Sequence, residues 1–600
     1  MQLDFSKFKY KFTADFETST DKWHVDKARV WLWDLCNINN LKHRHGTTLE
    51  TFLDTLINIG KHGYEGVIIA FHNLAYDGNY LLYYLLEHGY TAVPEKPRAK
   101  QFTTLITEFG QHYAYEINFG RVCPFHKDFI ITVVDSYKTI HSSVHDIAEA
   151  FKLPIKKGEI DYDTVRPVDH TPTPEEIEYI ENDTEIIARA LQLNFKQGLT
   201  KVTQPANALA EFKRLHGKSV YEFDFPNDLN DSYLREAYFG GMCYAAPRYT
   251  DKILTGLISF DINSMYPAAM LHGKLPIGYP DFYVGDCRDI VKENEVFIQR
   301  FRCAYELKSK HIPTLFKNRY ILNGELHSTT SQGRCIEMTL TNLDIELLFE
   351  NYYVFDFVPL DGYIFKTRKG YEPTIEEFNN LSYQEYIELD GKGSIFYEYI
   401  KKWRQIKENS TGALRDIAKR MQNMLYGNFG KHINGKIKIP YIDDNGLLKY
   451  SVVNAGKERF EYIPLAIFIT SQCRYNLVKD ILKHYADFVY CDTDSMYLLD
   501  TADISDLHIH DRLYGAYKIE KIISKFKCLG SKRYICEYHK PNSEEVKFAV
   551  TCCGANGRVR EQLNFDNFVY NAQFDGKRTV KTVKGGKHIV DTTYKIKGDN

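Results

Sequence analysis

Two carboxylates, Asp492 and Asp494, stand two residues apart in the otherwise apolar and aromatic run "DFVYCDTDSMYLLD" at 487–500. Residues two apart in an extended chain share a face, so both acids point the same way. Adjacent anions are unfavourable unless a cation, a proton or a turn accommodates them. The run therefore predicts either a hairpin turn or half of a metal site, and other parts of the chain must decide between the two.

The size and composition of the chain limit its class. Its 600 residues exceed what one hydrophobic core usually supports, so several domains are expected. No uncharged apolar run reaches the length of a membrane span, and the first residues lack the apolar core of a signal peptide. The 12 cysteines are scattered without a C-x-x-C pair, which favours reduced thiols over disulfides or a zinc site. The net charge of −3 does not indicate a nucleic-acid-binding protein, although the charges of acidic sites and of a basic channel can cancel in that sum.

A second group of acids lies within residues 1–200, where β-rich runs alternate with helical stretches and predict an α/β domain. Asp15 and Glu17 share one face of "DFETST", and Asp77 follows a strand-like run. Tyr179 and Asp183 are neighbours at i and i+4 on a helix face. Acids and a phenol from separate elements are what two-cation phosphodiester hydrolysis requires. Taken alone, Asp77 and the glycine after it also fit an ordinary turn.

Local signals predict several other elements. Thr173 and Pro174 mark a helix start, a polar patch marks a domain boundary near 200, and 400–430 is a long helix. The segment "KIKIPYIDDNGLLKYSVVNA" and the lysine-rich tail around Gly585 and Gly586 each predict a β-hairpin.

The second half has its own acid at a strand end, Asp261 in "DINSMYP", followed by Tyr266. The helix over 410–430 has an apolar stripe and a separate face without acids, formed by Arg415, Lys419, Gln422, Asn423 and Tyr426. That face suits a nucleotide, with Lys407 and Lys419 on its phosphates and Tyr426 against its base.

Nine motifs together resemble the protein-primed family B DNA polymerases of small tailed bacteriophages of the podovirus type. The first three resemble 3′–5′ exonuclease motifs, and the fourth, "YFGG", resembles the loop between the two activities. The next three resemble the polymerase motifs A, B and C. The last two resemble a template-contacting element and a K-x-Y element. In that order the motifs are "DFETST", "HNLAYDG", "YIEND", "YFGG", "DINSMYP", "KRMQNMLYGNFG", "YCDTDS", "TSQCR" and "KRY".

The resemblance implies two catalytic centres that each bind two Mg²⁺ ions, which Mn²⁺ can replace. In the polymerase centre, Asp261 and Asp494 are the main ligands and Asp492 assists. In the exonuclease centre, Asp15, Glu17, Asp77 and Asp183 hold metal and Tyr179 orients water. Tyr266 excludes a 2′-hydroxyl or, as the alternative, is a core aromatic. The implied nucleotide-binding residues are Tyr266, Lys407, Lys419, Asn423 and Tyr426.

The resemblance also implies a set of DNA contacts. For His72 a packed core histidine remains the alternative. The residues with an implied DNA contact are Thr18, His72, Asn73, Tyr76, Ser136, Tyr137, Lys157, Tyr162, Tyr238, Gly240, Gly241, Gly427, Thr470, Arg474, Lys532 and Tyr534.

The implied fold is an α/β and α+β multidomain chain: an RNase H-like exonuclease followed by a right-hand polymerase with two subgroup-specific insertions. The expected boundaries are exonuclease 1–200, palm 201–271 and 462–550, first insertion 272–395, fingers 396–430, second insertion 431–461 and thumb 551–600.

The implied function is protein-primed replication of a linear viral genome with strand displacement and proofreading, in the cytoplasm of a bacterial host. The implied partners are primer-template and single-stranded DNA, dNTPs and a terminal protein, with no membrane. The chain is expected as a monomer or as a heterodimer with the terminal protein.

Three positions depart from the family pattern: Met265, Met424 and Thr551, the last where a basic thumb residue is common. None of them removes a catalytic carboxylate. Two rival functions are a nuclease whose second half only binds DNA and a non-enzymatic protein that coats single strands. Against the second rival, the placed acids would repel phosphate in the absence of metal.

Overall fold

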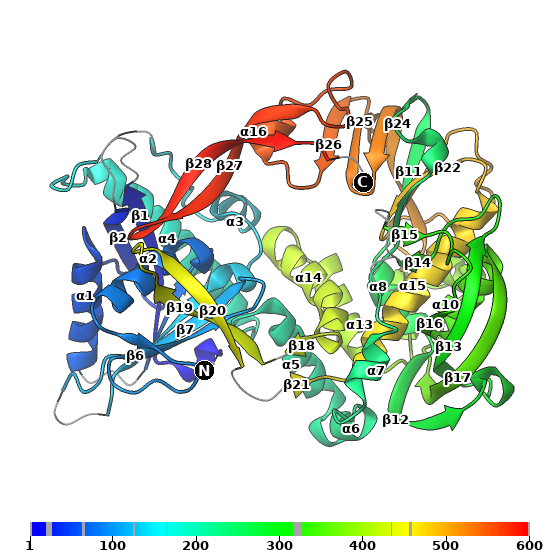
Figure 1. Ribbon diagram of the computed structural model, residues 1–600, viewed down its shortest axis with the longest axis horizontal. Helices are drawn as coiled ribbons and strands as arrows, with labels where there is room; N and C mark the ends of the chain where they lie inside the picture. The colour runs from blue at the N-terminus through cyan, green and yellow to red at the C-terminus, as the bar shows by residue number, and fades with distance from the viewer. Residues whose placement is uncertain are drawn as a thin grey trace.

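The computed structural model describes residues 3–19, 27–62, 66–123, 127–161, 164, 166–316, 326–433, 435–454 and 459–597. The N-terminal part forms one lobe and most of the remaining chain a second, with α14 (Gly412–Phe429) between them (Figure 1). Within the described residues, no helix combines the length and the apolarity needed to cross a membrane.

The first lobe is built on a mixed eight-stranded sheet with the order β3-β2-β1-β4-β8-β7-β6-β5. Strands β1, β4 and β8 are parallel neighbours, and β2 and β3 extend the β1 edge antiparallel. The strands are β1 Tyr10–Ser19, β2 Arg29–Asn37, β3 His45–Gly46, β4 Val67–Phe71, β5 Thr91–Ala92, β6 Gln101–Ile106, β7 His112–Asn118 and β8 Ile130–Asp135. The helices are α1 Leu49–Lys61, α2 Leu74–Glu87, α3 Val144–Ala150 and α4 Pro174–Lys196.

Helix α4 begins where the sequence predicts. Thr173 caps it through a reciprocal capping box with Glu176, and Pro174 occupies the first turn. By contrast, Asp77 lies in the first turn of α2, so interpreting it as part of an ordinary turn was wrong. The left-handed Asn73 (φ 77°) directs the chain from β4 into α2.

The second lobe centres on an antiparallel sheet in which β26-β25-β24-β11-β23-β22-β9 follow one another and β10 pairs with β24. Its neighbouring strands β11 and β23 are more than two hundred residues apart in the sequence, so strands from the C-terminal part of the chain complete the sheet. The strands are β9 Cys243–Ala245, β10 Ile253–Leu254, β11 Leu257–Ile262, β22 Phe488–Asp492, β23 Ser495–Leu499, β24 Tyr517–Gly530, β25 Arg533–His539 and β26 Lys547–Cys552.

A four-stranded sheet with the order β12-β17-β13-β16 lies beside the central sheet. Its strands are β12 Leu275–Val284, β13 Glu295–Leu307, β16 Ile336–Thr341 and β17 Tyr352–Arg368. Two short pairs are β14 Leu315–Phe316 with β15 His327–Ser328, and β18 His432–Ile433 with β21 Arg459–Phe460. The helices of the second lobe are α5 Gln204–His216, α6 Lys218–Asp224, α7 Asp231–Arg235, α8 Met265–His272, α10 Asn342–Asn351, α11 Ile375–Asn380, α12 Tyr383–Leu389, α13 Tyr397–Glu408, α14, α15 Ile463–Lys483 and α16 Gly557–Arg560.

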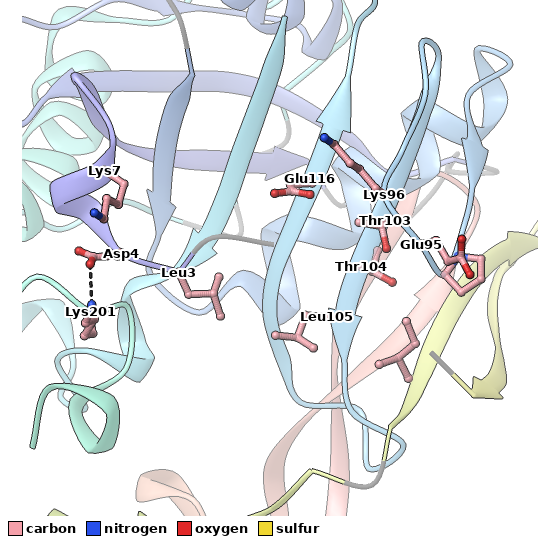
Figure 2. A pocket seen from close by; sticks show the side chains of 12 residues that line it. Leu3, Asp4, Lys7, Glu95, Lys96, Thr103, Thr104, Leu105, Glu116 and Lys201 are labelled. Atoms are coloured by element: carbon pink, nitrogen blue, oxygen red, sulfur yellow. Dashed lines mark hydrogen bonds and ion pairs between the residues drawn. The ribbon is translucent and has the colours of Figure 1, made fainter. Parts of the chain in front are cut away.

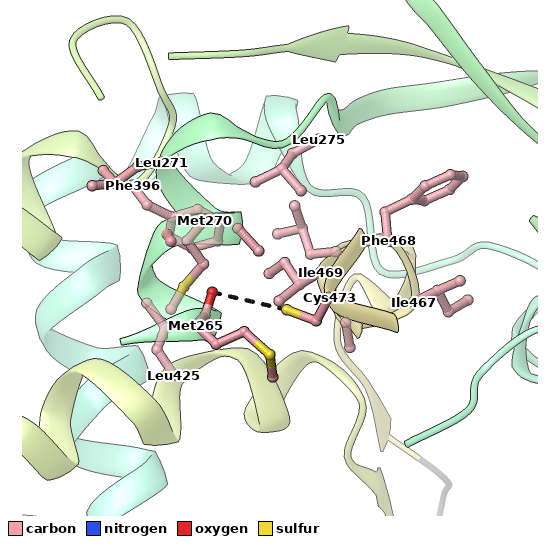
Figure 3. Close-up of a cluster of buried hydrophobic side chains, with 14 of the residues drawn as sticks. Met265, Met270, Leu271, Leu275, Phe396, Leu425, Ile467, Phe468, Ile469 and Cys473 are labelled. Atoms are coloured by element: carbon pink, nitrogen blue, oxygen red, sulfur yellow. Dashed lines mark hydrogen bonds between the residues drawn. The ribbon is translucent and has the colours of Figure 1, made fainter. Parts of the chain in front are cut away.

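The largest hydrophobic core joins α8, α14 and α15 (Figure 3). Met265 on α8, Leu425 on α14 and Ile469 on α15 are all buried there. The Cys473 thiol of α15 lies 3.8 Å from the carbonyl oxygen of Met265. This packing fixes α8 directly after the strand that carries Asp261.

The long helix predicted over 400–430 is broken. Helix α13 ends at Glu408, and α14 begins at Gly412 with φ +60°. The intervening Asn-Ser-Thr competes for backbone hydrogen bonds, and the Ser410 hydroxyl donates to the Ile406 carbonyl at 2.5 Å. The predicted apolar stripe is present, with Ile417, Met421 and Leu425 buried.

Both predicted hairpins are confirmed, and both reach the first lobe (Figure 1). They are β19 Lys436–Ile442 with β20 Leu448–Asn454, and β27 Gln573–Val583 with β28 Gly586–Lys595. The Thr104 hydroxyl of the first lobe donates a hydrogen bond to the Lys438 carbonyl of the first hairpin at 2.8 Å. The second donates from Lys587 Nζ to the Ala75 carbonyl at 2.7 Å.

Glycine is required at the tip of the second hairpin. A Cβ on Gly586 would lie 2.4 Å from the Tyr80 ring of α2, and one on Gly585 would lie 2.0 Å from the Ala28 carbonyl oxygen. The Ala28 N–H also donates to the Lys584 carbonyl at 2.7 Å. The C-terminal hairpin is therefore docked onto the N-terminal sheet by backbone contacts.

A buried ion pair supports α13. Arg404 (1% exposed) donates to Asp390 (2% exposed) at 2.5 Å, and the other oxygen of that carboxylate lies 2.7 Å from His272. Asp390→Ala is expected to destabilise the protein by about 3–5 kcal/mol, because the guanidinium stays buried without its partner. Urea unfolding followed by tryptophan fluorescence, to which the adjacent Trp403 contributes, measures the loss.

The matched control is Glu388→Ala, which removes the more exposed pair with Lys401. Its expected effect is below about 1 kcal/mol. Equal losses in the two variants would show that the buried pair contributes no more than a surface pair.

Candidate active sites

The register of the central sheet brings the predicted acids of the second half together. Asp261 on β11 is directly opposite Ser495 on β23, and the Ile262 N–H donates to the Asp494 carbonyl at 2.8 Å. Thr493, with φ +63°, forms the turn between β22 and β23. The run at 487–500 is therefore a hairpin, and its tip carries Asp492 and Asp494 beside Asp261.

Burial and neighbouring acids raise the pKa of Asp261 and of Asp494. Burial, Asp494 and Glu520 raise the pKa of Asp261 to about 7, against a lowering by Lys419 and Lys518. Burial also raises the pKa of Asp494, with Asp492 and Glu520 adding to the shift. The arrangement concentrates negative charge that a bound cation would relieve.

The sequence reading missed Glu520. Ser259 pairs with Lys521 and Phe260 with Ile519, so Glu520 is the extra residue of a β-bulge in β24. Bulges commonly re-aim a side chain beside an active site. Because this acid enters the site through pairing with a distant strand, no local spacing in the sequence identifies it.

Lys407, Tyr266 and Tyr426 gather beside these acids. The Tyr266 and Tyr426 rings stack with centroids 4.0 Å apart. Lys407 Nζ lies 3.2 Å from the Ser264 hydroxyl and 5.0 Å from the centre of the Tyr514 ring. Burial lowers the pKa of Lys407 to about 8.

Some of the remaining polar residues of α14 are exposed, and others are buried. Lys419 and Gly427 are exposed and Asn423 is half-buried. Gln422 is buried and accepts a hydrogen bond from the Tyr514 hydroxyl at 2.9 Å. Gln422 therefore supports Tyr514 and is not part of an open polar face.

Arg474 and Thr470, for which a template contact is predicted, are both buried in this conformation. Arg474 is 3% exposed, forms an ion pair with Asp344 at 2.7 Å and donates to the carbonyls of Phe239 and Gly240. Thr470 is buried and donates within α15. In this conformation Arg474 holds the loop at 238–241, and neither side chain is free for DNA.

The loop at 238–241 lies against both the hairpin tip and α14. A Cβ on Gly241 would lie 2.8 Å from Thr493 Cγ2, whereas one on Gly240 would meet nothing within 4 Å. A Cβ on Gly430, after α14, would lie 2.6 Å from the Tyr238 hydroxyl.

Lys532 and Tyr534 lie beside the same tip. Lys532 Nζ is 3.6 Å from Asp492 Oδ1 and is more than half exposed. Tyr534 packs among Tyr490, Tyr497 and Phe526, and the Tyr497 hydroxyl donates to its oxygen at 3.2 Å. The cross-strand partner of Tyr534 is Thr551, one of the departures from the family pattern.

The predicted N-terminal residues line one pocket of about 780 Å³. Part of its wall comes from the C-terminal hairpin through Arg578, His588 and Asp591. The predicted residues among its lining are Asp15, Glu17, Thr18, His72, Asn73, Tyr76, Asp77, Lys157, Tyr179 and Asp183.

The acids of this pocket are buried and repel one another. Burial and Asp183 raise the pKa of Asp15 to about 7, while Lys157 lowers it. Burial and Asp15 raise the pKa of Glu17 and of Asp77. Burial raises the pKa of Asp183, although it is bonded to Lys157.

Several predicted DNA contacts of this pocket are engaged within the protein. The His72 ring nitrogens lie 3.1 Å from the Ser136 hydroxyl and 2.8 Å from the Ser142 carbonyl, and burial lowers its pKa to about 4. His72 therefore fits its packed alternative. Ser136 is fully buried in this conformation, and its DNA contact stays a prediction.

Other predicted contacts are better placed for a ligand. The Thr18 and Tyr76 hydroxyls pair at 3.0 Å at the pocket wall. Asp135, which the sequence reading missed, accepts at 3.0 Å from the backbone N–H groups of Asn73 and Tyr137 and so orients both residues. Tyr162 lies outside the described residues.

The chemistry of both sites fits divalent cations. Each site supplies several carboxylates with raised pKa values, and hard cations prefer such oxygen donors. Oδ1 of Asp183 is buried and, within the described part of the chain, has no hydrogen-bond partner. Among the described residues, Asp34, His45 and Glu181 place three ligand atoms within 4.8 Å of one another. Without an ion, no three acids of either predicted centre come that close together within this part of the chain.

Another groove, of about 880 Å³, lies elsewhere (Figure 2). It runs beside β6 and β7 and carries charges of both signs from Asp4, Lys96, Glu116 and Lys201. No acid of the predicted centres lines it.

Comparison with known proteins identifies the family. The profile of DNA polymerase type B, organellar and viral, matches residues 60–174 and 169–503. The chain belongs to this family. The predicted resemblance to family B DNA polymerases of bacteriophages is thereby confirmed.

Full-length relatives come from phages. The DNA polymerase of Bacillus phage M2 is 32% identical over 610 residues, covering 98% of this chain and 99% of that protein. The DNA polymerases of Bacillus phage phi29 and Streptococcus phage Cp-1 are each 31% identical, over 98% of this chain and 99% and 98% of theirs.

Solved structures agree with this type B polymerase assignment. Phi29 DNA polymerase complexed with primer-template DNA matches with a TM-score of 0.87 and 29% identity, covering 98% of this chain and 100% of that chain. Its complex with primer-template DNA and incoming nucleotide substrates matches with a TM-score of 0.86 and 30% identity, at the same coverage. The mixed α/β multidomain fold of this polymerase is thus that of phi29 DNA polymerase.

The contact between Gly241 and Thr493 makes a prediction for DNA synthesis. Gly241→Ala is expected to lower kcat for nucleotide incorporation by about 10- to 100-fold, because the added methyl displaces the tip that carries Asp492 and Asp494. Single-turnover extension of a primed template measures the change.

Gly240→Ala is the matched control in the same loop, since its methyl group meets no neighbouring atom. Its effect on kcat should be clearly smaller. If the two alanine variants lose activity equally, the loop does not act through the hairpin tip.

Proposed function

We propose that this type B polymerase synthesises DNA at the central site and degrades it from the 3′ end at the N-terminal pocket. The observation that carries the proposal is the presence of two separate groups of carboxylates, one in each lobe. Asp261, Asp492 and Asp494 belong to the first, and Asp15, Glu17, Asp77 and Asp183 to the second. Two groups of this kind suit two phosphoryl-transfer reactions that run independently.

The mixed sheet with α4 across it supports an RNase H-like exonuclease over 1–200. The central antiparallel sheet supports a palm over 201–271 and 462–550, with fingers over 396–430 and a thumb over 551–600. The four-stranded sheet and the first hairpin correspond to insertions at 272–395 and 431–461. The match to phi29 DNA polymerase supports this division of the chain.

In synthesis, the protein positions its substrates and balances their charge. Lys407 and Lys419 meet the triphosphate, and the stacked Tyr266 and Tyr426 present flat faces to the nucleoside. Lys532, beside Asp492, holds the primer end. Asp261 and Asp494, with help from Asp492, would hold two Mg²⁺ ions, which would supply charge neutralisation and Lewis acidity at the reacting phosphate, and Mn²⁺ would fit the same oxygen donors.

In degradation, the terminal nucleotide enters the N-terminal pocket as a frayed single strand. Thr18 and Tyr76 line this pocket, and the Tyr137 ring, which packs against His72, offers a stacking surface. The Tyr179 phenol orients the attacking water, and Lys157 balances the charge of Asp183. Asp15, Glu17, Asp77 and Asp183 would hold the cations.

The two hairpins support processive, strand-displacing synthesis. Each is anchored on the first lobe, and their tips approach each other, since a Cβ on Gly446 would lie 3.2 Å from Lys584 Cε. The chain is thereby linked around the space beside the central sheet. Enclosure of the product by these hairpins would retain DNA without base-specific contacts.

Protein-primed initiation draws support from the exposed apolar side chains of the first insertion. Tyr353, Phe355 and Val358 on β17 are 56%, 52% and 51% exposed. Exposed apolar surface of this kind is typical of a partner-binding site. A terminal protein that offers a hydroxyl as primer is the proposed partner, and phage relatives support the cytoplasm of a bacterial host.

Separate inactivation of the two centres tests the central proposal. Asp494→Ala should abolish Mg²⁺-dependent primer extension and leave primer degradation, because the acid belongs only to the central site. Asp15→Ala with Asp183→Ala should do the reverse. Extension and degradation of one labelled primer measure both activities, and their joint loss in either variant would contradict two independent centres.

Initiation on protein is tested with a candidate terminal protein, Mg²⁺, dNTPs and template. A labelled nucleotide should become covalently attached to that protein only when the polymerase is present. Phe355→Ser should reduce this attachment and leave extension of a DNA primer unchanged. Attachment at the wild-type level in Phe355→Ser would place the partner on another surface.

A further inference from the structure

A third group of metal-ligating side chains lies beside the N-terminal pocket and is distinct from its catalytic acids. Asp15 on β1 pairs with Asp34 on β2, and Asp34 pairs with His45 on β3. Directly opposed residues share a face, so these three side chains form a row across the sheet edge. Helix α4 packs against β1 and β2 and supplies Glu181.

Asp34 is fully buried, and one of its oxygens is unused. Oδ2 lies 2.9 Å from His43 Nδ1 and accepts from the Thr184 hydroxyl at 2.5 Å. Oδ1 is also buried and has no hydrogen-bond partner within the described residues. A buried, unsatisfied carboxylate oxygen is unfavourable in a protein unless something binds it.

The neighbouring ligands converge on this carboxylate. Asp34, His45 and Glu181 each place one ligand atom within 4.8 Å of the others. His45 Nδ1 and Glu181 Oε1 are 3.3 Å apart. Tetrahedral zinc, with bonds of about 2.0–2.2 Å, spaces its ligand atoms about 3.4 Å apart. Two of the three ligands therefore already have the spacing of a zinc site.

The exposure of these residues leaves room for adjustment and for water. The side chains of His45 and Glu181 are 42% and 32% exposed, whereas Asp34 is enclosed. The two outer ligands can close on an ion with little disturbance of the sheet. Three protein ligands with a water molecule in the fourth position would complete the tetrahedral shell that zinc prefers.

The nearby cations are already engaged. His43 bridges Asp34 and Glu185, at 2.9 and 3.2 Å. Arg189 pairs with Glu185 at 2.6 Å. Glu181 has no such partner besides His45 among the ion pairs of the described residues. Glu181 and the unpaired Oδ1 of Asp34 therefore remain available to a cation from solution.

We propose that Asp34, His45 and Glu181 bind one Zn²⁺ ion, separate from the Mg²⁺ sites of the two catalytic centres. An imidazole with carboxylates favours Zn²⁺ over Mg²⁺, which prefers an all-oxygen shell. The ion ties the β2–β3 edge to α4, the helix that carries Tyr179 and Asp183. Its role is structural: it fixes the position of this helix against the sheet.

The test is calorimetric titration of the full-length protein with Zn²⁺ in excess Mg²⁺, so that the acid-only sites are occupied. The wild type should bind one Zn²⁺, and so should Asp15→Ala with Asp183→Ala, which keeps the proposed ligands. His45→Ala and Glu181→Gln should each weaken binding by at least about tenfold. Zn²⁺ should also raise the thermal midpoint of the wild type and not that of His45→Ala.

The matched control is His145→Ala, which removes another histidine close to a glutamate, since His145 and Glu149 are 3.6 Å apart on α3. Zn²⁺ binding should be unchanged in this variant. Circular dichroism without Zn²⁺ establishes that each variant is folded. The proposal is overturned if the wild type binds no Zn²⁺ in excess Mg²⁺, or if His45→Ala and Glu181→Gln bind it as tightly as the wild type.

Discussion

The pairing of β11 with the hairpin formed by β22 and β23 is the constraint on which the central site depends. Backbone hydrogen bonds hold Asp261 beside Asp494, although burial and the neighbouring acids raise the pKa of both carboxyl groups. The surrounding elements stabilise this strand pairing. Met242 accepts from the Thr493 N–H at 2.6 Å, and α8 follows β11 directly into the largest core. The free energy of folding is thus what keeps the anions together.

Arg474 extends this support outward. It lies on α15, binds Asp344 of α10 and donates to the backbone of the loop at 238–241, whose Gly241 touches the hairpin tip. A single buried cation therefore connects helices α15 and α10 with the loop that contacts the acids. Arg474 acts on the position of the acids, whereas Lys419 acts on their charge. Lys419 lowers the pKa of Asp261, which burial raises.

Local features of the sequence predicted much of the fold. The caps at Thr173 and Pro174, both hairpins and the strand faces of Asp15 and Glu17 follow from neighbouring residues. The break before Gly412 was missed because short-range periodicity continues across it. Glu520 and the burial of Arg474 were also missed, because each depends on a partner from a distant segment. Residue spacing suggests which acids meet, but it does not show which polar side chains are already engaged within the protein.

The two lobes place the same kind of acid in different surroundings. Around Asp261 the balancing lysines lie on α14 and β24, within the second lobe. Around Asp15 the balancing cation is Lys157, and part of the pocket wall is the C-terminal hairpin. That hairpin is fixed to α2 by Lys587 and to the strand edge by Lys584. Because the end of the chain lines a pocket made at its beginning, the N-terminal site has its full shape only after the second lobe has folded and docked.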